Sequence, residues 1–353
     1  MTHSPNEPSH PPSSDQLDHS PLNAGFLLAP FAFDDVYGEE CLTAVRQVAR
    51  VLLPIATRDD VNHHRVPWLD KVDLLFTGWG APRLDDNLLQ RMPRLKAVFF
   101  GAGSVRDLIT NEFWERGIIL TSAALVNARP VAEFALGAIL LGLKRVWHQA
   151  REVRARRGYP DPPLSTPGAY RSIVGVVSYG AIGQLLCELL RPFDVQIIVY
   201  DPYVTNGVLE AQHHIRARTL EELFSTADVI SLHTPLLPAT ERLITGALIS
   251  SMKYGATLVN TARGAIVREE ELASVLDRRT DLQAILDVTW PEPPPTSSAL
   301  YDLPNVFITP HIAGSMGLER RRIGKAMVAE MQNYLEGNPL RFRIERLQSA
   351  LRA

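Results

Sequence analysis

Three residues suited to binding a carboxylate and moving a proton lie in the second half of the sequence. Arg263 stands in "NTARG", Glu292 in "DVTWPEP" and His311 in "TPHIAG", each shortly after an apolar stretch. An Arg grips a carboxylate with a rigid fork of N–H groups, and a His exchanges a proton near neutral pH. A carboxylate beside the His orients its ring and stabilises its cation. Taken singly, such an Arg is more often a surface ion pair and such a His a structural residue, so only their joint position indicates a site.

A glycine-containing turn in "IVGVVSYGAIGQ" indicates a nucleotide site. Gly180 and Gly183 follow an apolar strand with the spacing of the last two glycines of G-x-G-x-x-G, but Ser178 replaces the first glycine. Ser178 can hold this turn if its φ stays negative, and its hydroxyl can bond locally. Gly180 would then let a pyrophosphate approach, and Gly183 would allow close strand–helix packing. The amides of Ala181 and Ile182 would face the phosphates. The alternative is an ordinary turn between a strand and a helix.

An acidic residue ends the next apolar stretch, as a dinucleotide site requires. Asp201 closes "VQIIVYD", about 20 residues after the start of the turn. Its carboxylate suits a ribose diol and would repel a 2′-phosphate, and no Arg follows it, so NAD is favoured over NADP. The alternative is a turn residue before Pro202. With a nicotinamide beside the Arg, Glu and His, the set is suited to hydride transfer to a 2-oxo acid, with the proton from His311.

The elements that would position these residues alternate along the chain. Apolar stretches typical of buried parallel strands are separated by amphipathic stretches typical of helices, which predicts two α/β domains with mostly parallel sheets. The predicted strands cover residues 25–29, 50–54, 72–77, 96–100, 118–121, 172–177, 195–200, 228–233, 256–260, 282–287 and 306–309. The predicted helices cover residues 39–49, 105–117, 131–146, 182–190, 219–224, 246–252, 268–278 and 318–337. We expect the last helix to return to the first domain.

The most apolar stretch, Phe134–Leu143, is about half as long as the ~20 residues that a membrane span needs. Glu133 and Lys144 flank it, which favours a buried or interface helix. Pro130 precedes it, at a position where the first turn of a helix tolerates proline.

Composition excludes several classes of protein. The chain has 353 residues and a formal net charge of −3, so no overall positive field attracts nucleic acid or an anionic membrane. Cys41 and Cys187 do not make a disulfide framework, which favours a reducing, cytoplasmic compartment. The first 21 residues lack the basic start and apolar core of a signal peptide, and we expect a disordered tail there.

Several longer motifs occur in an order that resembles the D-isomer-specific 2-hydroxyacid dehydrogenase family. They are "NARPVAEFALGAIL", "GVVSYGAIGQ", "ADVISLHTPLLPATERLI", "GATLVNTARGAIV", "LDVTWPEP" and "PNVFITPHIAG". The resemblance implies two doubly wound parallel-sheet domains, with an NAD-binding Rossmann domain inserted into a flavodoxin-like substrate domain. The implied division is a disordered tail at 1–21, a substrate domain at 22–127 plus 313–341, an NAD domain at 128–312 and a C-terminal tail at 342–353. It also implies a homodimer whose NAD domains pair through the long helix and the loop after it.

The resemblance implies a role for each matching residue. Arg263, Glu292 and His311 match the catalytic residues of an NAD-dependent dehydrogenase that acts on a small 2-hydroxy or 2-oxo acid. Ala102 and Gly103 match the loop whose amides hold the substrate carboxylate, together with Arg263 and His311. The implied NAD contacts are Gly180, Ala181, Ile182, Gly183, Asp201, His233, Thr234, Pro235, Thr240, Thr261, Ala262, Arg263, Asp287 and His311.

Two departures and two histidine pairs need separate interpretation. Arg106 stands where many members of the family carry an Asp, which indicates either an extra anionic group on the substrate or a solvated cation at a helix start. Trp79 either lines the substrate pocket or is buried in the hinge. The pairs 63–64 and 213–214 are expected to be solvated histidines, because neither has a partner at metal-ligand spacing, and we expect no metal site.

Three alternative functions remain open. Formate dehydrogenases resemble this family but carry Gln in place of Glu292, which argues against formate oxidation. Phosphite oxidation keeps all three catalytic residues. An NAD-sensing interaction protein, like the corepressor branch of the family, also keeps them and would show little turnover. No nucleic-acid-binding module is evident.

Overall fold

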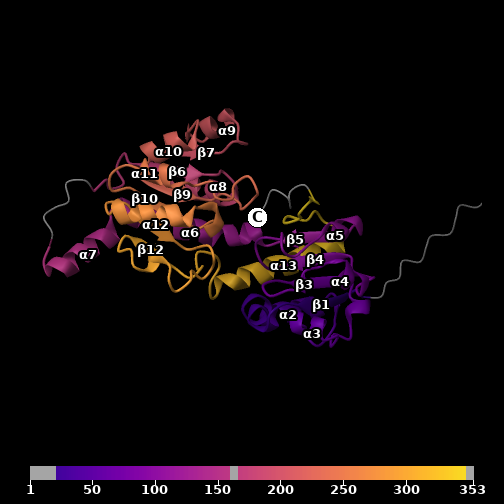
Figure 1. Cartoon of the computed structure of the whole chain (residues 1–353). Coiled ribbons are helices and arrows are strands. Elements are labelled where there is room, and N and C mark those ends of the chain that lie inside the picture. Colours follow the sequence, from indigo (N-terminus) through magenta and orange to yellow (C-terminus); the bar gives the residue numbers. More distant parts are fainter. Residues whose placement is uncertain (1–20, 160–165, 347–353) are drawn as a thin grey trace, which may run out of the picture.

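Two parallel sheets organise the chain in the computed structural model, which describes residues 21–159 and 166–346 (Figure 1). A five-stranded sheet has the order β2-β1-β3-β4-β5, and a seven-stranded sheet has the order β12-β11-β10-β9-β6-β7-β8. The strands are β1 Asn23–Leu27, β2 Arg50–Val51, β3 Leu74–Thr77, β4 Ala97–Phe100, β5 Ile119–Ser122, β6 Ile173–Val177, β7 Gln196–Tyr200, β8 Ile215–Arg216, β9 Val229–Leu232, β10 Thr257–Asn260, β11 Gln283–Leu286 and β12 Val306–Ile308.

Helices cover both faces of each sheet, because successive strand residues point to opposite faces and are apolar on both. In the first sheet, Leu75 packs with Val61 and Phe113 on one face, whereas Leu74 and Phe76 pack with Cys41 and Ile323 on the other. The helices are α1 Pro30–Ala32, η1 Phe33–Tyr37, α2 Gly38–Arg46, α3 Arg58–Asn62, η2 Leu69–Lys71, α4 Asp86–Gln90, α5 Asn111–Glu115, α6 Ala124–Leu143, α7 Val146–Arg156, α8 Ala181–Leu190, α9 Asn206–Ala211, α10 Leu220–Thr226, α11 Gly246–Ser250, η3 Gly264–Ile266, α12 Glu269–Arg278, η4 Ala299–Tyr301 and α13 Glu319–Glu336. The predicted class of two doubly wound parallel-sheet domains is confirmed.

Two long helices connect the two lobes of the chain, of which the first is built on the five-stranded sheet and the second on the seven-stranded sheet. Ile323 and Met327 of α13 are buried in the core of the first lobe, although this helix follows the last strand of the second. Ala123, just before α6, belongs to the same core, whereas Ile139 and Leu143 near its end pack in the second lobe. We therefore propose that the domains divide near residue 128 and again near residue 313.

Helix α6 differs from its predicted form. It begins at Ala124, so Pro130 lies inside the helix and not in its first turn. Proline has no N–H to donate to the carbonyl of residue 126, but that part of α6 is held between the two lobes and stays helical. By length and composition, α6 is long and apolar enough to cross a membrane. Its Ala132, Ala135 and Ile139 are buried against the second sheet, as in a core helix.

Other differences lie in short or exposed elements. The predicted helix over 105–117 is a series of turns that ends in the five-residue α5. The sequence does not predict α7, α9 or the two-residue β8. Near the C-terminus, Phe342 O accepts a hydrogen bond from Ser122 N, and Ile344 N donates one to Leu120 O. Part of the predicted C-terminal tail therefore pairs with the edge of β5. Of the expected tail at 1–21, residues 1–20 lie outside the described residues.

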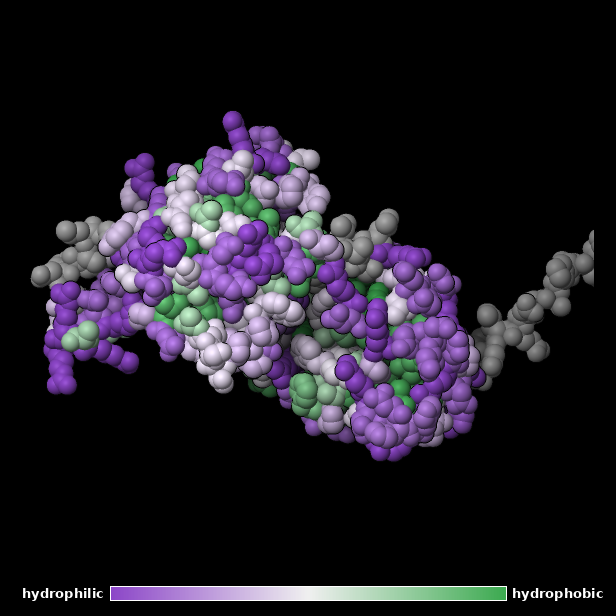
Figure 2. Space-filling model, in the orientation of Figure 1, coloured by the Kyte–Doolittle hydropathy of each residue, from purple (hydrophilic) through white to green (hydrophobic). Residues whose placement is uncertain are grey.

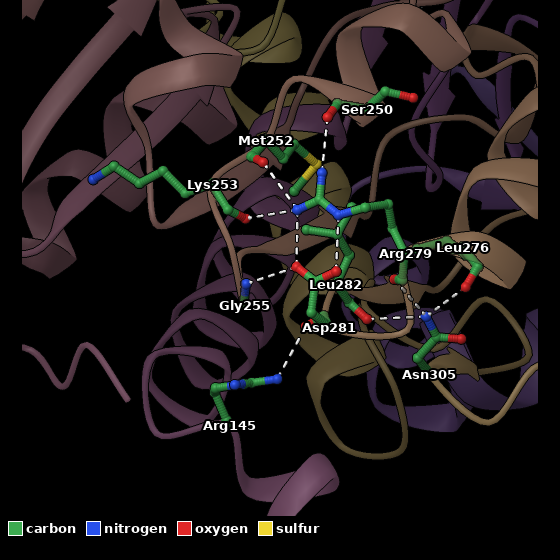
Figure 3. Close-up of polar contacts among 10 residues, drawn as sticks. All are labelled: Arg145, Ser250, Met252, Lys253, Gly255, Leu276, Arg279, Asp281, Leu282 and Asn305. Carbon is green, nitrogen blue, oxygen red and sulfur yellow. Dashed lines mark hydrogen bonds and ion pairs between the residues drawn. The ribbon is translucent and has the colours of Figure 1, made fainter. Parts of the chain in front are cut away.

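A polar network fastens the junction of α6 and α7 to the second sheet (Figure 3). Arg279 makes two hydrogen bonds of 2.8 Å to the carboxylate of Asp281, which also accepts one from Gly255 N. The buried Arg145 donates to Asp281 O at 3.0 Å. Burial opposes ionisation of Asp281, but these hydrogen bonds hold its pKa below its ordinary value. Gly255 and Asp281 come just before β10 and β11, so the network stabilises the end of the sheet where these strands begin. Arg263, Glu292 and His311 lie beyond the opposite end, where the strands finish.

The surface is mostly hydrophilic on the face shown in Figure 2. Hydrophobic residues are visible in several small areas of both lobes. Cys41 and Cys187 are both free and buried.

Candidate active site

The three strand-end residues gather at one edge of the second sheet. Arg263 follows β10, Glu292 follows β11 and His311 follows β12, and these strands are parallel neighbours. The carboxyl ends of neighbouring parallel strands meet at the same edge, where ligands bind in open α/β sheets. Residues that are far apart in the sequence are therefore brought to one edge of the sheet.

His311 and Glu292 form a hydrogen-bonded pair. His311 Nδ1 lies 2.6 Å from Glu292 Oε1, and the two side chains are 49% and 41% exposed. A carboxylate accepts hydrogen bonds, so Nδ1 carries the proton of this bond. The other ring nitrogen, Nε2, is thereby the atom that is left to exchange a proton with a ligand.

Asp287 positions the His311 loop. Its carboxylate accepts hydrogen bonds from Thr309 Oγ1 at 2.6 Å, Ile312 N at 2.8 Å and Ala313 N at 2.8 Å. Its main-chain oxygen accepts from His311 N at 3.0 Å, and His311 has a φ of 54°. The resemblance implies an NAD contact for Asp287, but in this structure its buried carboxylate holds the loop that carries the histidine.

Arg263 lies beside the pair in a tightly packed loop. A Cβ on Gly264 would lie 2.0 Å from Thr289 C, so only glycine lets the segment after β11 pass so close to the segment after β10. Arg263 Nη1 donates to Ala262 O at 2.7 Å, and no other hydrogen bond of its guanidinium is found among residues 21–159 and 166–346. Burial lowers the pKa of Arg263, whereas the charges of Glu292 and Asp107 oppose this shift. The guanidinium therefore remains a partly desolvated cation with free donors.

A pocket of about 600 Å³ opens beside the histidine and the glutamate. Its walls come from the ends of β11 and β12, from the segment after Glu292 and from η4. The lining residues are Asp287, Thr289, Glu292, Pro293, Pro294, Leu300, Tyr301, Val306, Ile308, Thr309, Pro310 and His311.

The glycine-containing turn at residues 178–183, here named the cradle, has the form of a dinucleotide-binding turn. Gly180 precedes the ten-residue α8, which begins at Ala181 and Ile182. A Cβ on Gly180 would meet nothing within 4 Å, so the space in front of the helix is open. A Cβ on Gly183 would lie 2.3 Å from Ser178 O, so the helix packs against the turn as closely as a dinucleotide fold requires.

Ser178 adopts a left-handed backbone conformation. Its φ is 78°, so the condition of a negative φ is not met. Ser178 N donates to Tyr200 O at 2.8 Å, and Gly183 packs on its carbonyl, so the backbone keeps the glycine conformation whatever residue occupies it. For a residue with a Cβ, this left-handed conformation costs about 1–2 kcal/mol relative to glycine.

Asp201 lies next to Ser178, and main-chain amides donate hydrogen bonds to most of the acceptor sites of its carboxylate. Its Oδ2 accepts from Tyr179 N at 2.8 Å, and its Oδ1 accepts from Tyr203 N at 2.8 Å and Val204 N at 3.2 Å. The side chain of Ser178 lies 3.5 Å from Oδ2. Asp201 thus joins the ends of β6 and β7 and remains at the mouth of the cradle.

Residues after β9 and β10 have polar atoms that the protein leaves without partners. His233 Nδ1, Thr234 Oγ1 and Thr261 Oγ1 are buried and make no hydrogen bond in the described part of the chain. Sheet order reverses between β9 and β6, which is where α/β sheets bind nucleotides. Buried polar atoms without partners are costly unless a ligand or water satisfies them, so this donor and acceptor set fits a polar cofactor such as NAD. Nearby, Ala262 is buried, and Thr240 Oγ1 donates to Pro235 O at 2.5 Å, which closes the loop after β9.

Burial lowers the pKa of His233 from 6.5 to about 4. The imidazole of His233 therefore binds a proton at a higher pH in the unfolded chain than in the folded chain, so a falling pH favours unfolding. The free energy of unfolding should fall by on the order of 3 kcal/mol between about pH 6.5 and about pH 4. We expect the melting temperature of His233→Asn to fall less over this range than that of the unaltered protein, in melts without cofactor. The exposed His64→Asn is the control, and equal pH slopes for the His233 variant and the unaltered protein would contradict the prediction.

The substrate loop predicted at Ala102 and Gly103 lies across from this edge. Ser122 Oγ donates to Gly103 O at 2.8 Å and shapes the loop. Arg106 lies in a turn, and its guanidinium donates to the main-chain oxygen of Leu236 in the other lobe. It is therefore neither at a helix start nor solely a solvated cation. Asp107, Ser122 and Leu236 are not found by sequence reasoning, because their closeness to the site depends on how the lobes meet.

The remaining singled-out residues are Trp79 and the two histidine pairs. Trp79 is half-buried, and the guanidinium carbon of Arg320 lies 5.5 Å from its ring centre. His63, His64 and His213 are exposed as expected. His214 is buried with its ring 5.7 Å from that of Tyr179, so the expectation that it is solvated is wrong. It packs inward because α9, which the sequence does not predict, ends just before it.

Comparison with known proteins identifies the second lobe. Residues 136–313 match the model of the D-isomer specific 2-hydroxyacid dehydrogenase NAD binding domain. The D-3-phosphoglycerate dehydrogenase of Mycobacterium tuberculosis is 32% identical over 257 residues, which is 73% of this chain and 48% of that protein. The chain thus spans about half the length of that relative. The (S)-sulfolactate dehydrogenase of Chromohalobacter salexigens is 31% identical over 274 residues, which is 75% of this chain and 88% of that protein.

Solved structures agree on the arrangement of the two lobes. The crystal structure of a Thermus thermophilus protein superposes with a TM-score of 0.72 at 28% identity, covering 92% of this chain and 100% of that one. An NAD-complexed D-isomer specific 2-hydroxyacid dehydrogenase from Lactobacillus delbrueckii has a TM-score of 0.74 at 19% identity, covering 92% and 100%, which supports the fold.

Proposed function

Because the chain belongs to the D-isomer specific 2-hydroxyacid dehydrogenase family, we propose that it is an NAD-dependent oxidoreductase that transfers a hydride between nicotinamide and C2 of a D-2-hydroxy acid or 2-oxo acid. The observation that carries this proposal is the hydrogen-bonded pair of His311 and Glu292 beside the partly desolvated Arg263. These residues lie at the edge of the domain that matches the family model. Each supplies one requirement of the reaction.

In the direction of reduction, NADH held by these residues would supply the hydride that C2 receives. His311 donates the proton on Nε2 to the oxygen on C2, while Nδ1 keeps its hydrogen bond to Glu292. Glu292 stabilises the imidazolium that precedes this transfer. In the oxidation direction, Nε2 takes the proton back.

Arg263 and the substrate loop would orient the acid. The free N–H groups of Arg263 suit the substrate carboxylate and the oxygen on C2, and partial desolvation strengthens both interactions. The amides of Ala102 and Gly103 would hold the same carboxylate from the opposite lobe. A substrate gripped from two lobes has its reacting carbon fixed relative to the cofactor, which is the main requirement of hydride transfer.

The cofactor would lie along the cradle and the strand ends. Gly180, Ala181, Ile182 and Gly183 would face the pyrophosphate, and Asp201 the adenosine ribose. The nicotinamide half would contact His233, Thr234, Pro235, Thr240, Thr261, Ala262, Arg263, Asp287 and His311. The carboxylate of Asp201 supports NAD over NADP.

We also propose a homodimer in a reducing, cytoplasmic compartment, with a small acid as substrate and no nucleic-acid or membrane partner. Leu141 of α6 and Val146 of α7 are exposed hydrophobic residues, on and just after the long helix that the family resemblance assigns to pairing.

The test is NADH oxidation by the purified protein across a panel of 2-oxo acids, with NADPH in parallel. The panel includes glyoxylate, hydroxypyruvate, bulky 2-oxo acids, dicarboxylic acids and phosphorylated acids. Turnover with at least one 2-oxo acid supports the proposal. Tight NADH binding without turnover across the panel would instead favour the NAD-sensing alternative, and no NADH binding would refute the proposal.

Arg106 supports a narrower substrate class, a 2-oxo acid with a second anionic group. Its guanidinium spans from the substrate loop to the carbonyl of Leu236, and it makes no ion pair within the described residues. A cation without a carboxylate partner at the junction of the lobes is suited to an anion. The names of two relatives, phosphoglycerate and sulfolactate dehydrogenase, also denote substrates with two anionic groups.

We expect Arg106→Gln to lower the ratio of kcat/KM for phosphohydroxypyruvate over hydroxypyruvate by roughly tenfold or more, mainly through KM. The two substrates differ only in the phosphate group, so the ratio isolates its recognition. Arg50→Gln in the same lobe is the control, because Arg50 is exposed and lies on the edge strand β2. An equal loss with both substrates would mean that Arg106 serves only to hold the lobes together.

A further inference from the structure

The turn between β6 and α8 holds a serine in a conformation that favours glycine. Ser178 has a φ of 78° at the position of the first glycine of the dinucleotide motif. Its N–H is bound to Tyr200 O, and Gly183 packs on its carbonyl, so the backbone cannot relax to suit the side chain. A glycine would remove this strain, and strained residues in folded proteins cluster at functional sites.

The hydroxyl of Ser178 faces the carboxylate that the dinucleotide motif provides for a ribose. Ser178 Oγ lies 3.5 Å from Asp201 Oδ2. A carboxylate has about four sites for hydrogen-bond donors, and main-chain amides of residues 179, 203 and 204 fill three of those on Asp201. The fourth site is held by the hydroxyl of Ser178, in the longest of these bonds and the only one from a group that can rotate away.

We propose that Ser178 is a cofactor-binding residue, and that its hydroxyl and the carboxylate of Asp201 together bind the adenosine ribose diol of NAD. One ribose hydroxyl takes the loosely held site on Asp201, and the released hydroxyl of Ser178 donates to a ribose oxygen. A diol is both donor and acceptor, so it matches a carboxylate paired with a hydroxyl. This inference rests on the proposed use of NAD.

A glycine at this position would leave Asp201 as the sole ligand of the diol. The serine adds a donor, at the cost of a strained backbone in the free protein. Because neighbouring residues hold that backbone in place, Ser178→Gly removes the hydroxyl and the strain without a need for the turn to move. Ser178→Ala removes the hydroxyl and keeps the strain. The two variants therefore separate hydrogen bonding from conformational strain.

The experiment measures the Kd of NADH by fluorescence titration and the melting temperature without cofactor, for the full chain and both variants. We expect Kd to rise about three- to tenfold in Ser178→Gly and in Ser178→Ala, as for the loss of one hydrogen bond. The melting temperature should rise in Ser178→Gly only. The preference for NADH over NADPH should shrink in both variants, because a phosphate offers no diol.

The matched control is His64→Gly. His64 is exposed, lies in the other lobe and has a φ of 54°, so its replacement relieves the same kind of strain far from the cradle. We expect it to raise the melting temperature and leave the Kd of NADH as it was.

Two outcomes would overturn the proposal. NADH binding by Ser178→Gly that is as tight as in the unaltered protein would mean that the serine is merely tolerated. Weaker binding in Ser178→Gly alone, with Ser178→Ala binding NADH as tightly as the unaltered protein, would assign the effect to the relief of strain and not to the hydroxyl. If the unaltered protein does not bind NADH, the proposed function fails first, and that result is distinct from both.

Discussion

His311→Asn should lower kcat/KM by roughly a hundredfold to ten-thousandfold while NADH binding remains within about threefold of the unaltered protein. Asparagine cannot donate a proton as an acid, but it is among the residue types that tolerate the positive φ of His311. The loop should therefore keep its conformation through the hydrogen bonds to Asp287. Steady-state rates of NADH oxidation on the best substrate, together with a fluorescence titration of NADH, measure both effects.

Glu292→Gln is the companion variant. Glutamine can still accept the hydrogen bond from Nδ1, but it carries no charge to stabilise an imidazolium. We expect a smaller loss of kcat/KM than for His311→Asn, because the proton donor itself remains.

The result that would contradict the first prediction is a His311→Asn enzyme that keeps more than a tenth of the original kcat/KM. It would show that His311 is not the acid.

The second large effect is expected for Arg263→Lys. Lysine keeps the positive charge, but it has no planar fork that can hold a carboxylate and an adjacent oxygen at once. We expect kcat/KM to fall on the order of a hundredfold to a thousandfold, with a lower kcat as well as a higher KM, because the oxygen on C2 gains charge in the transition state.

Arg278→Lys is the matched control for this substitution. Arg278 lies on the exposed side of α12, where its guanidinium donates to Ser274 Oγ at 2.7 Å. We expect its kinetic constants to match those of the unaltered protein. If Arg263→Lys raised KM without lowering kcat, Arg263 would bind the carboxylate but would not act on the oxygen on C2.

The strands and the positions of the strand-end residues could be predicted from the sequence for a local reason. Buried parallel strands consist of short, nearly continuous apolar segments, and these are visible without knowledge of their partners. Once the strands are identified, the polar residues after them must share an edge of the sheet. The cluster of Arg263, Glu292 and His311 is a consequence of that rule.

Elements whose form depends on distant contacts were not predictable in this way. The start of α6 depends on the lobe that precedes it, which keeps residues around Pro130 helical, and the short β8 exists only because β7 lies beside it. The segment 105–110 has a helical pattern, yet it forms turns where the lobes meet.

The details of the candidate site belong to the tertiary structure. Local sequence offers no way to tell that Gly183 and Tyr200 O hold Ser178 at a positive φ, or that Asp287 is occupied by the loop of His311. The same is true of Arg106, whose partner Leu236 lies in the other lobe. Residue types and strand positions are recorded locally in the sequence, whereas backbone strain, hydrogen-bond partners and contacts between lobes arise only when segments far apart in the chain are packed together.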